Sequence, residues 1–178
     1  MDHEHLLEQA ERLATADPGR PRTASLKRAV STAYYAVFHH RVNAAVRHAL
    51  GARRDAAGTR RLLARGYSHE GLRATSAAFI AGVGGWPAWM RDAVEGTGLE
   101  VPPELRTACR PHVRLHTLRE AADYDPGWRT ERGEVLFTIT QARQAITLFD
   151  AARPAPAARF FLAAAPLWDT LRRRRGGT

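Results

Sequence analysis

Two tyrosines and two histidines lie together in the stretch AYYAVFHH, residues 33–40, inside a long run with helical periodicity. Tyr35 and His39 are four residues apart, so a helix places a phenol and an imidazole on the same face. Arg28 and Thr32 continue that face toward the N-terminus. Buried polar groups need hydrogen-bonding partners. The stripe therefore either hydrogen-bonds to a neighbouring helix and fixes its position, or lines a functional cleft with Tyr35 and His39.

A second cluster of charged residues occurs in LREAADYDPGW, residues 118–128. Arg119 and Asp123 have the spacing of an ion pair within one helix. Asp125 adds a second carboxylate near the predicted helix C-terminus, where the helix dipole disfavours negative charge. The two aspartates either face a cation or only form the turn that follows. The candidate cations are Arg28, His39 and Arg119.

Three other patterns have residue types that can form sites. His112 and His116 have the i, i+4 spacing of two metal ligands on one helix, but no third ligand is indicated, so we expect no metal. Trp86 and Trp89 could form an exposed aromatic platform for a base or a partner, although core filling is favoured. The GVGG stretch lacks the lysine of a phosphate-binding loop, and no cofactor is predicted.

Helical periodicity runs along the whole chain, and no segment shows the alternation typical of a strand, so the fold class is all-α. Long helices are predicted over 3–16, 23–50, 68–81, 103–122 and 130–152. Residues 51–67 are expected to form a loop with one or two helical turns, and 82–101 an irregular region. Residues 153–158 are expected to be a linker before a last helix in which Pro166 causes a kink.

Length and composition indicate one domain of 178 residues with a net charge of +9. This charge favours a polyanionic partner, but four of the charges lie in Arg172–Arg175, and a basic tail can simply be solvated. Cys109 is the single cysteine, which excludes an internal disulfide and thiolate metal clusters. The N-terminus is acidic and amphipathic rather than signal-like, and no apolar run is long enough to span a membrane, so a cytoplasmic location is expected.

The two motifs together resemble a known family. LKRAVSTAYYAVFHH resembles the Arg-Ala-x-Ser-x-Ala-Tyr-Tyr-Ala-x-Phe-His helix of HEPN-domain proteins, and LREAADYDP resembles their Leu-Arg-x-x-Ala-Asp-Tyr-Asp segment. The resemblance covers roughly residues 5–152 and leaves out 82–101. It implies an antiparallel bundle of about five to seven helices over 1–152 that commonly dimerises, with 153–178 as a C-terminal helix and basic tail packed on the same domain.

The resemblance also implies an activity. Many HEPN proteins are metal-independent endoribonucleases of toxin–antitoxin, antiphage or CRISPR-associated systems, often encoded beside a nucleotidyltransferase partner. Their signature is an arginine followed four to six residues later by a histidine. Arg119 matches the arginine, but Asp123 and Tyr124 stand where the histidine is expected. An aspartate is a poor general acid at neutral pH unless burial raises its pKa.

Three interpretations stay open. In the first, Arg119 binds phosphate in a ribonuclease site with Asp123, Tyr124 and His39. In the second, the missing histidine marks a non-catalytic scaffold that binds a partner protein or nucleic acid. In the third, Tyr124 is a nucleotidylation target.

Two smaller predictions accompany these interpretations. Arg110 and His116 could form a shifted active site upstream on the same helix. RNA contacts are predicted for Arg28, Tyr35, Arg110 and the tail residues Arg172, Arg173 and Arg174.

Overall fold

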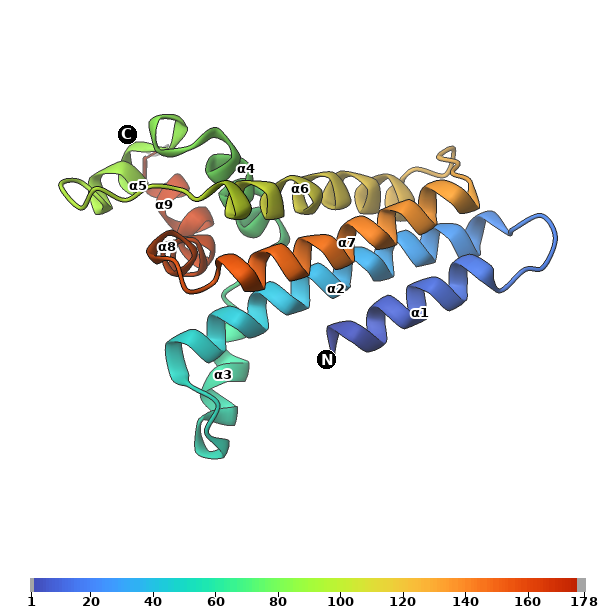
Figure 1. Ribbon diagram of the computed structural model, residues 1–178, viewed down its shortest axis with the longest axis horizontal. Helices are drawn as coiled ribbons and strands as arrows, with labels where there is room; N and C mark the ends of the chain where they lie inside the picture. Colours follow the sequence, from blue (N-terminus) through green and yellow to red (C-terminus); the bar gives the residue numbers. More distant parts are fainter. Residues whose placement is uncertain (1, 176–178) are drawn as a thin grey trace.

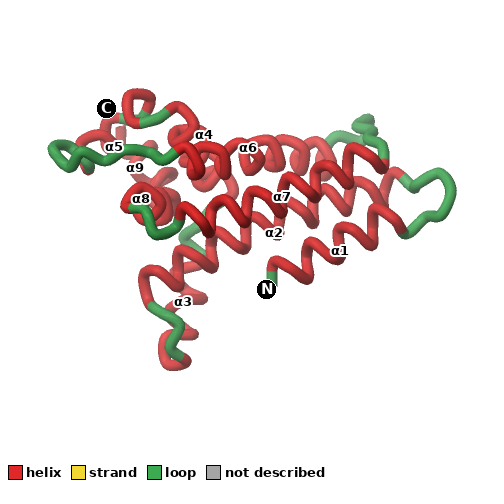
Figure 2. The backbone as a smooth tube through the Cα atoms, in the orientation of Figure 1, coloured by secondary structure: helices red, strands yellow, loops and turns green. Residues whose placement is uncertain are grey.

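The computed structural model describes residues 2–175 of the chain, with side chains up to residue 171, and contains only helices there, which confirms the all-α prediction (Figures 1 and 2). The α-helices are α1 His3–Thr15, α2 Thr23–Leu50, α3 Ala57–Ala64, α4 His69–Ala81, α5 Ala88–Ala93, α6 Pro103–Tyr124, α7 Arg132–Ala152, α8 Pro156–Ala164 and α9 Trp168–Arg175. Three short 3-10 helices are η1 Arg54–Ala56, η2 Val83–Gly85 and η3 Ala165–Leu167. No described helix is long and apolar enough to cross a membrane.

Four long helices form the bundle. α1 and α2 make one antiparallel hairpin, and α6 and α7 make another beside it (Figure 1). The two hairpin loops lie at the same end of the bundle, as the loop segments in Figure 2 show. Arg132 joins them, because its guanidinium donates to the backbone carbonyl groups of Ala14 (3.2 Å), Asp17 and Gly19 (3.0 Å).

α2 runs through the centre and packs against α1, α6 and α7. Its middle section is buried nearly all round, which explains the unbroken run of small and apolar residues there. Tyr34 is fully buried. Arg41 is also fully buried, with its guanidinium 3.7 Å from the centroid of the Phe149 ring and its Nη2 donating to the carbonyl of Ala108 at 3.0 Å.

Most helix ends follow from local chemistry. Ser68 caps α4 by accepting a hydrogen bond from the amide of Gly71, and Pro103 occupies the first turn of α6. α7 begins at Arg132, two residues later than predicted, because Glu131 and Glu134 form a capping box.

One prediction about a segment needs correction. The linker expected at 153–158 is shorter, since α8 begins at Pro156, where a proline at the first turn loses no hydrogen bond. The described part of residues 1–152 contains the seven α-helices α1 to α7, within the predicted five to seven, and the last predicted helix is divided by η3 at Pro166.

The aromatic residues of the irregular region fill the core, as favoured. Trp86 is buried, stacks near Phe160 and donates from Nε1 to the carbonyl of Ala78 at 3.0 Å. Trp89 is half-buried and contacts Trp168 edge to face.

Candidate functional site

Arg119 is the central residue of the candidate site, and α6 directs it against α2. Its Nη2 donates to the hydroxyl of Tyr35 at 3.1 Å, and its Nε lies 2.9 Å from Oδ2 of Asp123. The latter contact is an ion pair by distance, although the Nε–H is not aimed for a hydrogen bond. The Arg119 side chain is only 11% exposed. The predicted i, i+4 pair therefore exists, and it also clamps α6 to α2 through Tyr35.

The two predicted aspartates have different roles. Asp123 is held from α2 by Ser31, whose hydroxyl donates to Oδ1 at 2.5 Å. Asp125 follows the last residue of α6 and forms a turn by accepting the amide of Gly127 at 2.8 Å. The cation at this helix end is Lys27, which donates to the carbonyl oxygen of Asp125 at 2.6 Å. Sequence reasoning missed Ser31 and Lys27. Of the three cations it proposed, Arg119 pairs with Asp123, whereas Arg28 and His39 form no ion pair with either aspartate within the described residues.

Tyr35 is surrounded by two imidazoles. His39 lies one turn further along α2, with its ring stacked 6.1 Å from that of Tyr35. His69, at the start of α4, approaches the same tyrosine edge-on at 5.7 Å and accepts or donates a hydrogen bond through Nδ1 to the hydroxyl of Tyr34 at 2.8 Å. Both histidines are half-buried. His69 was not predicted, because no spacing rule relates it to residues of α2 or α6.

The surroundings keep these groups neutral. Burial lowers the pKa of His39, and burial together with the positive charge of Arg119 lowers the pKa of His69. Burial raises the pKa of Tyr34, so this phenol stays protonated at neutral pH. A fixed guanidinium and two neutral imidazoles around one tyrosine can bind an anion and transfer a proton near pH 7.

The remaining predicted residues lie in three different places. Tyr124 is 71% exposed, and its ring centroid is 5.3 Å from Cζ of Arg119. Arg28 is exposed on α2 and no hydrogen bond or ion pair of its side chain occurs in the described part of the chain. Arg110 is exposed two and a half turns before Arg119, on the opposite face of α6. The side chains of Arg172, Arg173 and Arg174 lie outside the described residues.

The shifted site built from Arg110 and His116 is not formed. His116 is buried at the core side of α6, with Nδ1 3.5 Å from Glu120, while Arg110 points to solvent on another face. His112 is fully buried and its Nδ1 is 2.9 Å from the hydroxyl of Ser76. Within residues 2–175 no group of three or more histidine, cysteine or acidic side chains is arranged to hold a metal ion.

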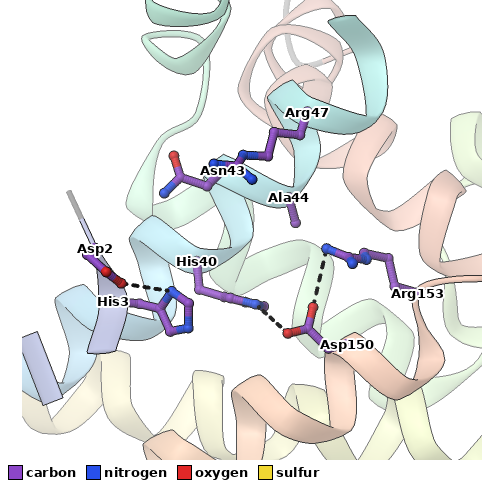
Figure 3. Close-up of a pocket in the computed structure, with 8 residues that line it drawn as sticks. All are labelled: Asp2, His3, His40, Asn43, Ala44, Arg47, Asp150 and Arg153. Atoms are coloured by element: carbon purple, nitrogen blue, oxygen red, sulfur yellow. Dashed lines mark hydrogen bonds and ion pairs between the residues drawn. The ribbon is translucent and has the colours of Figure 1, made fainter. Parts of the chain in front are cut away.

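A cavity of about 480 Å³ lies on another side of α2 (Figure 3). At its floor, Nε2 of His40 is 3.0 Å from Oδ2 of Asp150, and the ring of His3 packs edge-on against His40 at 4.8 Å. Arg47 and Arg153 line the rim, and Nη1 of Arg153 is 3.4 Å from Oδ1 of Asp150. Burial lowers the pKa of His40 to about 4, although the Asp150 carboxylate opposes this shift.

Comparison with known proteins adds no relative: no family model, no curated protein and no solved structure matches the chain.

Proposed function

We propose that the protein is an RNA-binding protein of the HEPN type that cleaves RNA without a metal ion. The observation that supports this most is the position of Arg119, fixed by Tyr35 and Asp123 next to the imidazoles of His39 and His69. The sequence lacks the histidine that follows the arginine in the HEPN signature. In our proposal, His69 supplies the imidazole from α4 instead.

The chemistry is a transesterification. One imidazole removes the proton from a ribose 2′-hydroxyl, the 2′-oxygen attacks the neighbouring phosphorus, and the bond to the 5′-oxygen breaks. The imidazolium formed in this transfer then gives its proton to the 5′-oxygen, so the products are a 2′,3′-cyclic phosphate and a 5′-hydroxyl. Arg119 stabilises the charge on the phosphate oxygens. His69 is suited to the proton transfer because Tyr34 holds its Nδ1, which leaves Nε2 for the substrate.

The test compares two arginines of the same helix. Purified protein is incubated with total RNA in EDTA, and the ends of the products are analysed. We expect cyclic-phosphate ends from the unaltered protein and from Arg110→Gln, whose arginine is exposed on the far face of α6. Arg119→Gln should lose cleavage while keeping its helical circular dichroism. Equal cleavage by the two variants would contradict the proposal.

The alternative is a non-catalytic scaffold. Two nitrogens of Arg119 already contact Asp123 and Tyr35, and Ser31 holds the same carboxylate, which fits a clamp between α2 and α6. RNA binding with steep salt dependence and no cleavage would favour this alternative. A homodimer and a nucleotidyltransferase or defence-complex partner remain predictions of the resemblance.

A further inference from the structure

The positive charge of the chain is concentrated in two short segments. Residues 47–65, which we name the basic arm, contain six arginines and one aspartate, a net charge of +5. Residues 172–175 contribute another four positive charges. The rest of the chain is balanced, with 17 basic and 17 acidic residues. An arginine-rich composition alone does not explain this distribution, because it would place the excess charge throughout the chain.

The basic arm projects from the bundle. It comprises the last turn of α2, η1 and α3, and Figure 1 shows α3 extending away from the four long helices. Its fold is stabilised internally, because Nη1 of Arg60 donates to the carbonyl groups of Gly51 (2.9 Å) and Arg53 (2.8 Å). The arm therefore presents its side chains from an ordered backbone.

Most arginines of the arm are available to a ligand. Arg53 is paired with Asp55 at 3.0 Å. The other exposed arginines of the arm form no hydrogen bond or ion pair through their side chains within the described residues; these are Arg47, Arg54, Arg61 and Arg65. Arg47 also lines the cavity in Figure 3, where the arm joins the bundle.

We infer that the basic arm binds the phosphate backbone of RNA. Guanidinium groups bind phosphate in a bidentate manner, and interfaces with nucleic acids are polar and strongly positive. A protein partner would need an apolar centre in the interface. The arm offers only Leu62 as an exposed large apolar side chain. RNA is named as the ligand because this inference rests on the proposed function, and the arm would hold the strand whose phosphate reaches Arg119.

Fluorescence anisotropy with a labelled single-stranded RNA of 30 nucleotides tests the inference. The arm variant carries Arg54→Gln, Arg61→Gln and Arg65→Gln. The control carries three substitutions with the same charge change at exposed arginines elsewhere, namely Arg20→Gln, Arg106→Gln and Arg159→Gln. The arm variant should bind more than 10-fold more weakly, and its plot of log affinity against log salt should flatten by about 2, since each phosphate contact on a single strand contributes roughly 0.7.

Four results would overturn the inference. Two concern the variants: an unchanged affinity of the arm variant, or an equal loss in the control. The other two concern the ligand: full competition by polyglutamate, which would indicate an acidic protein partner, or tighter binding of a labelled duplex DNA of the same length than of the RNA. The cleavage assay separates the two proposals. Loss of RNA binding in the arm variant without any Arg119-dependent cleavage supports the arm and refutes the ribonuclease. Arg119-dependent cleavage together with unchanged RNA binding in the arm variant supports the ribonuclease and refutes the role of the arm.

Discussion

His39 and His40 are neighbours in the chain, yet they face different helices and different chemistry. His39 stacks on Tyr35 beside Arg119 and His69, on the side of α2 covered by α4 and α6. His40 faces α1 and α7, where Asp150 binds its Nε2 and the cavity of Figure 3 opens. We call these regions the Arg119 cluster (Arg119, Asp123, Ser31, Tyr34, Tyr35, His39 and His69) and the His40 pocket (the residues drawn in Figure 3).

The cavity of Figure 3 lies beside His40, whose two ring nitrogens are not accessible to a ligand. Nε2 of His40 is bound to Asp150, and its Nδ1 is buried without a partner, so neither nitrogen can exchange a proton with a substrate. In the Arg119 cluster, one nitrogen of His69 is held by Tyr34, and its Nε2 forms no hydrogen bond in the described part of the chain. The volume of a cavity therefore does not identify the reactive region. The accessible ring nitrogen of His69 favours the Arg119 cluster over the His40 pocket as the site of proton transfer.

The strongest test of this comparison exchanges one histidine in each region for glutamine. His69→Gln should lower the rate of RNA cleavage by about 100-fold or more, the usual contribution of a proton-transfer residue. His40→Gln keeps an amide next to Asp150 and should change the rate less than about threefold, because His40 does not reach a substrate. Single-turnover rates at pH 7.5, with both proteins folded by circular dichroism, measure the difference. A larger loss in His40→Gln would place the reaction in the pocket.

The second test uses pH. Because burial lowers the pKa of His40 to about 4, the unfolded chain binds the extra proton between the ordinary pKa near 6.5 and this value. The contribution of neutral His40 to the free energy of unfolding is therefore fully present above pH 6.5 and is lost as the pH falls toward 4. His40 alone should lower the free energy of unfolding by about 2 kcal/mol between pH 7.5 and 5.0. Burial also lowers the pKa of His69, so both regions act in the same direction.

Urea denaturation at the two pH values measures this loss. His40→Gln should make the free energy of unfolding less dependent on pH, while His48→Gln, at an exposed position of the same helix, should leave the dependence unchanged. If His40→Gln retains the full pH dependence, the buried neutral state of His40 is not its cause.

The sequence predicted local relationships well and distant ones poorly. Periodicity places Tyr35 and His39 on one face, and the spacing of Arg119 and Asp123 predicts their ion pair. Ser31 could have been found in the same way, since it lies four residues before Tyr35. His69 could not, because only the packing of α4 against α6 brings the first residue of α4 to the cluster.

The same division applies to the fold. Long helices with caps were predicted almost to the residue, as α4 after Ser68 illustrates. The short helix Ala57–Ala64 was predicted only as one or two helical turns without bounds, and Ala88–Ala93 was not predicted. Helices of this length are unstable alone and form only when they dock against neighbouring segments. Their existence depends on tertiary contacts that have no local signal in the sequence.

A smaller effect is expected when the bond that orients His69 is removed. Tyr34→Phe deletes the hydroxyl 2.8 Å from Nδ1 of His69 and should lower the cleavage rate by about 10-fold while the affinity for RNA stays the same. The pH profile of the rate should also shift, which a loss of packing alone would not cause. Tyr67→Phe is the control, because it removes a buried hydroxyl that donates to the carbonyl of Leu162 outside the cluster. Equal changes in both variants would reduce Tyr34 to a packing role.

The smallest effect concerns the end of α6, which keeps the Arg119 cluster in register with α2. Lys27 donates to the carbonyl of Asp125 at 2.6 Å and so satisfies a group that the helix end leaves open. Lys27→Gln should lower the free energy of unfolding by about 0.5–1 kcal/mol. The neighbouring Arg28→Gln removes the same charge from a side chain without such a bond, and it should change stability by less than about 0.5 kcal/mol. Equal losses in urea denaturation would show that charge, rather than this hydrogen bond, joins α2 to the end of α6.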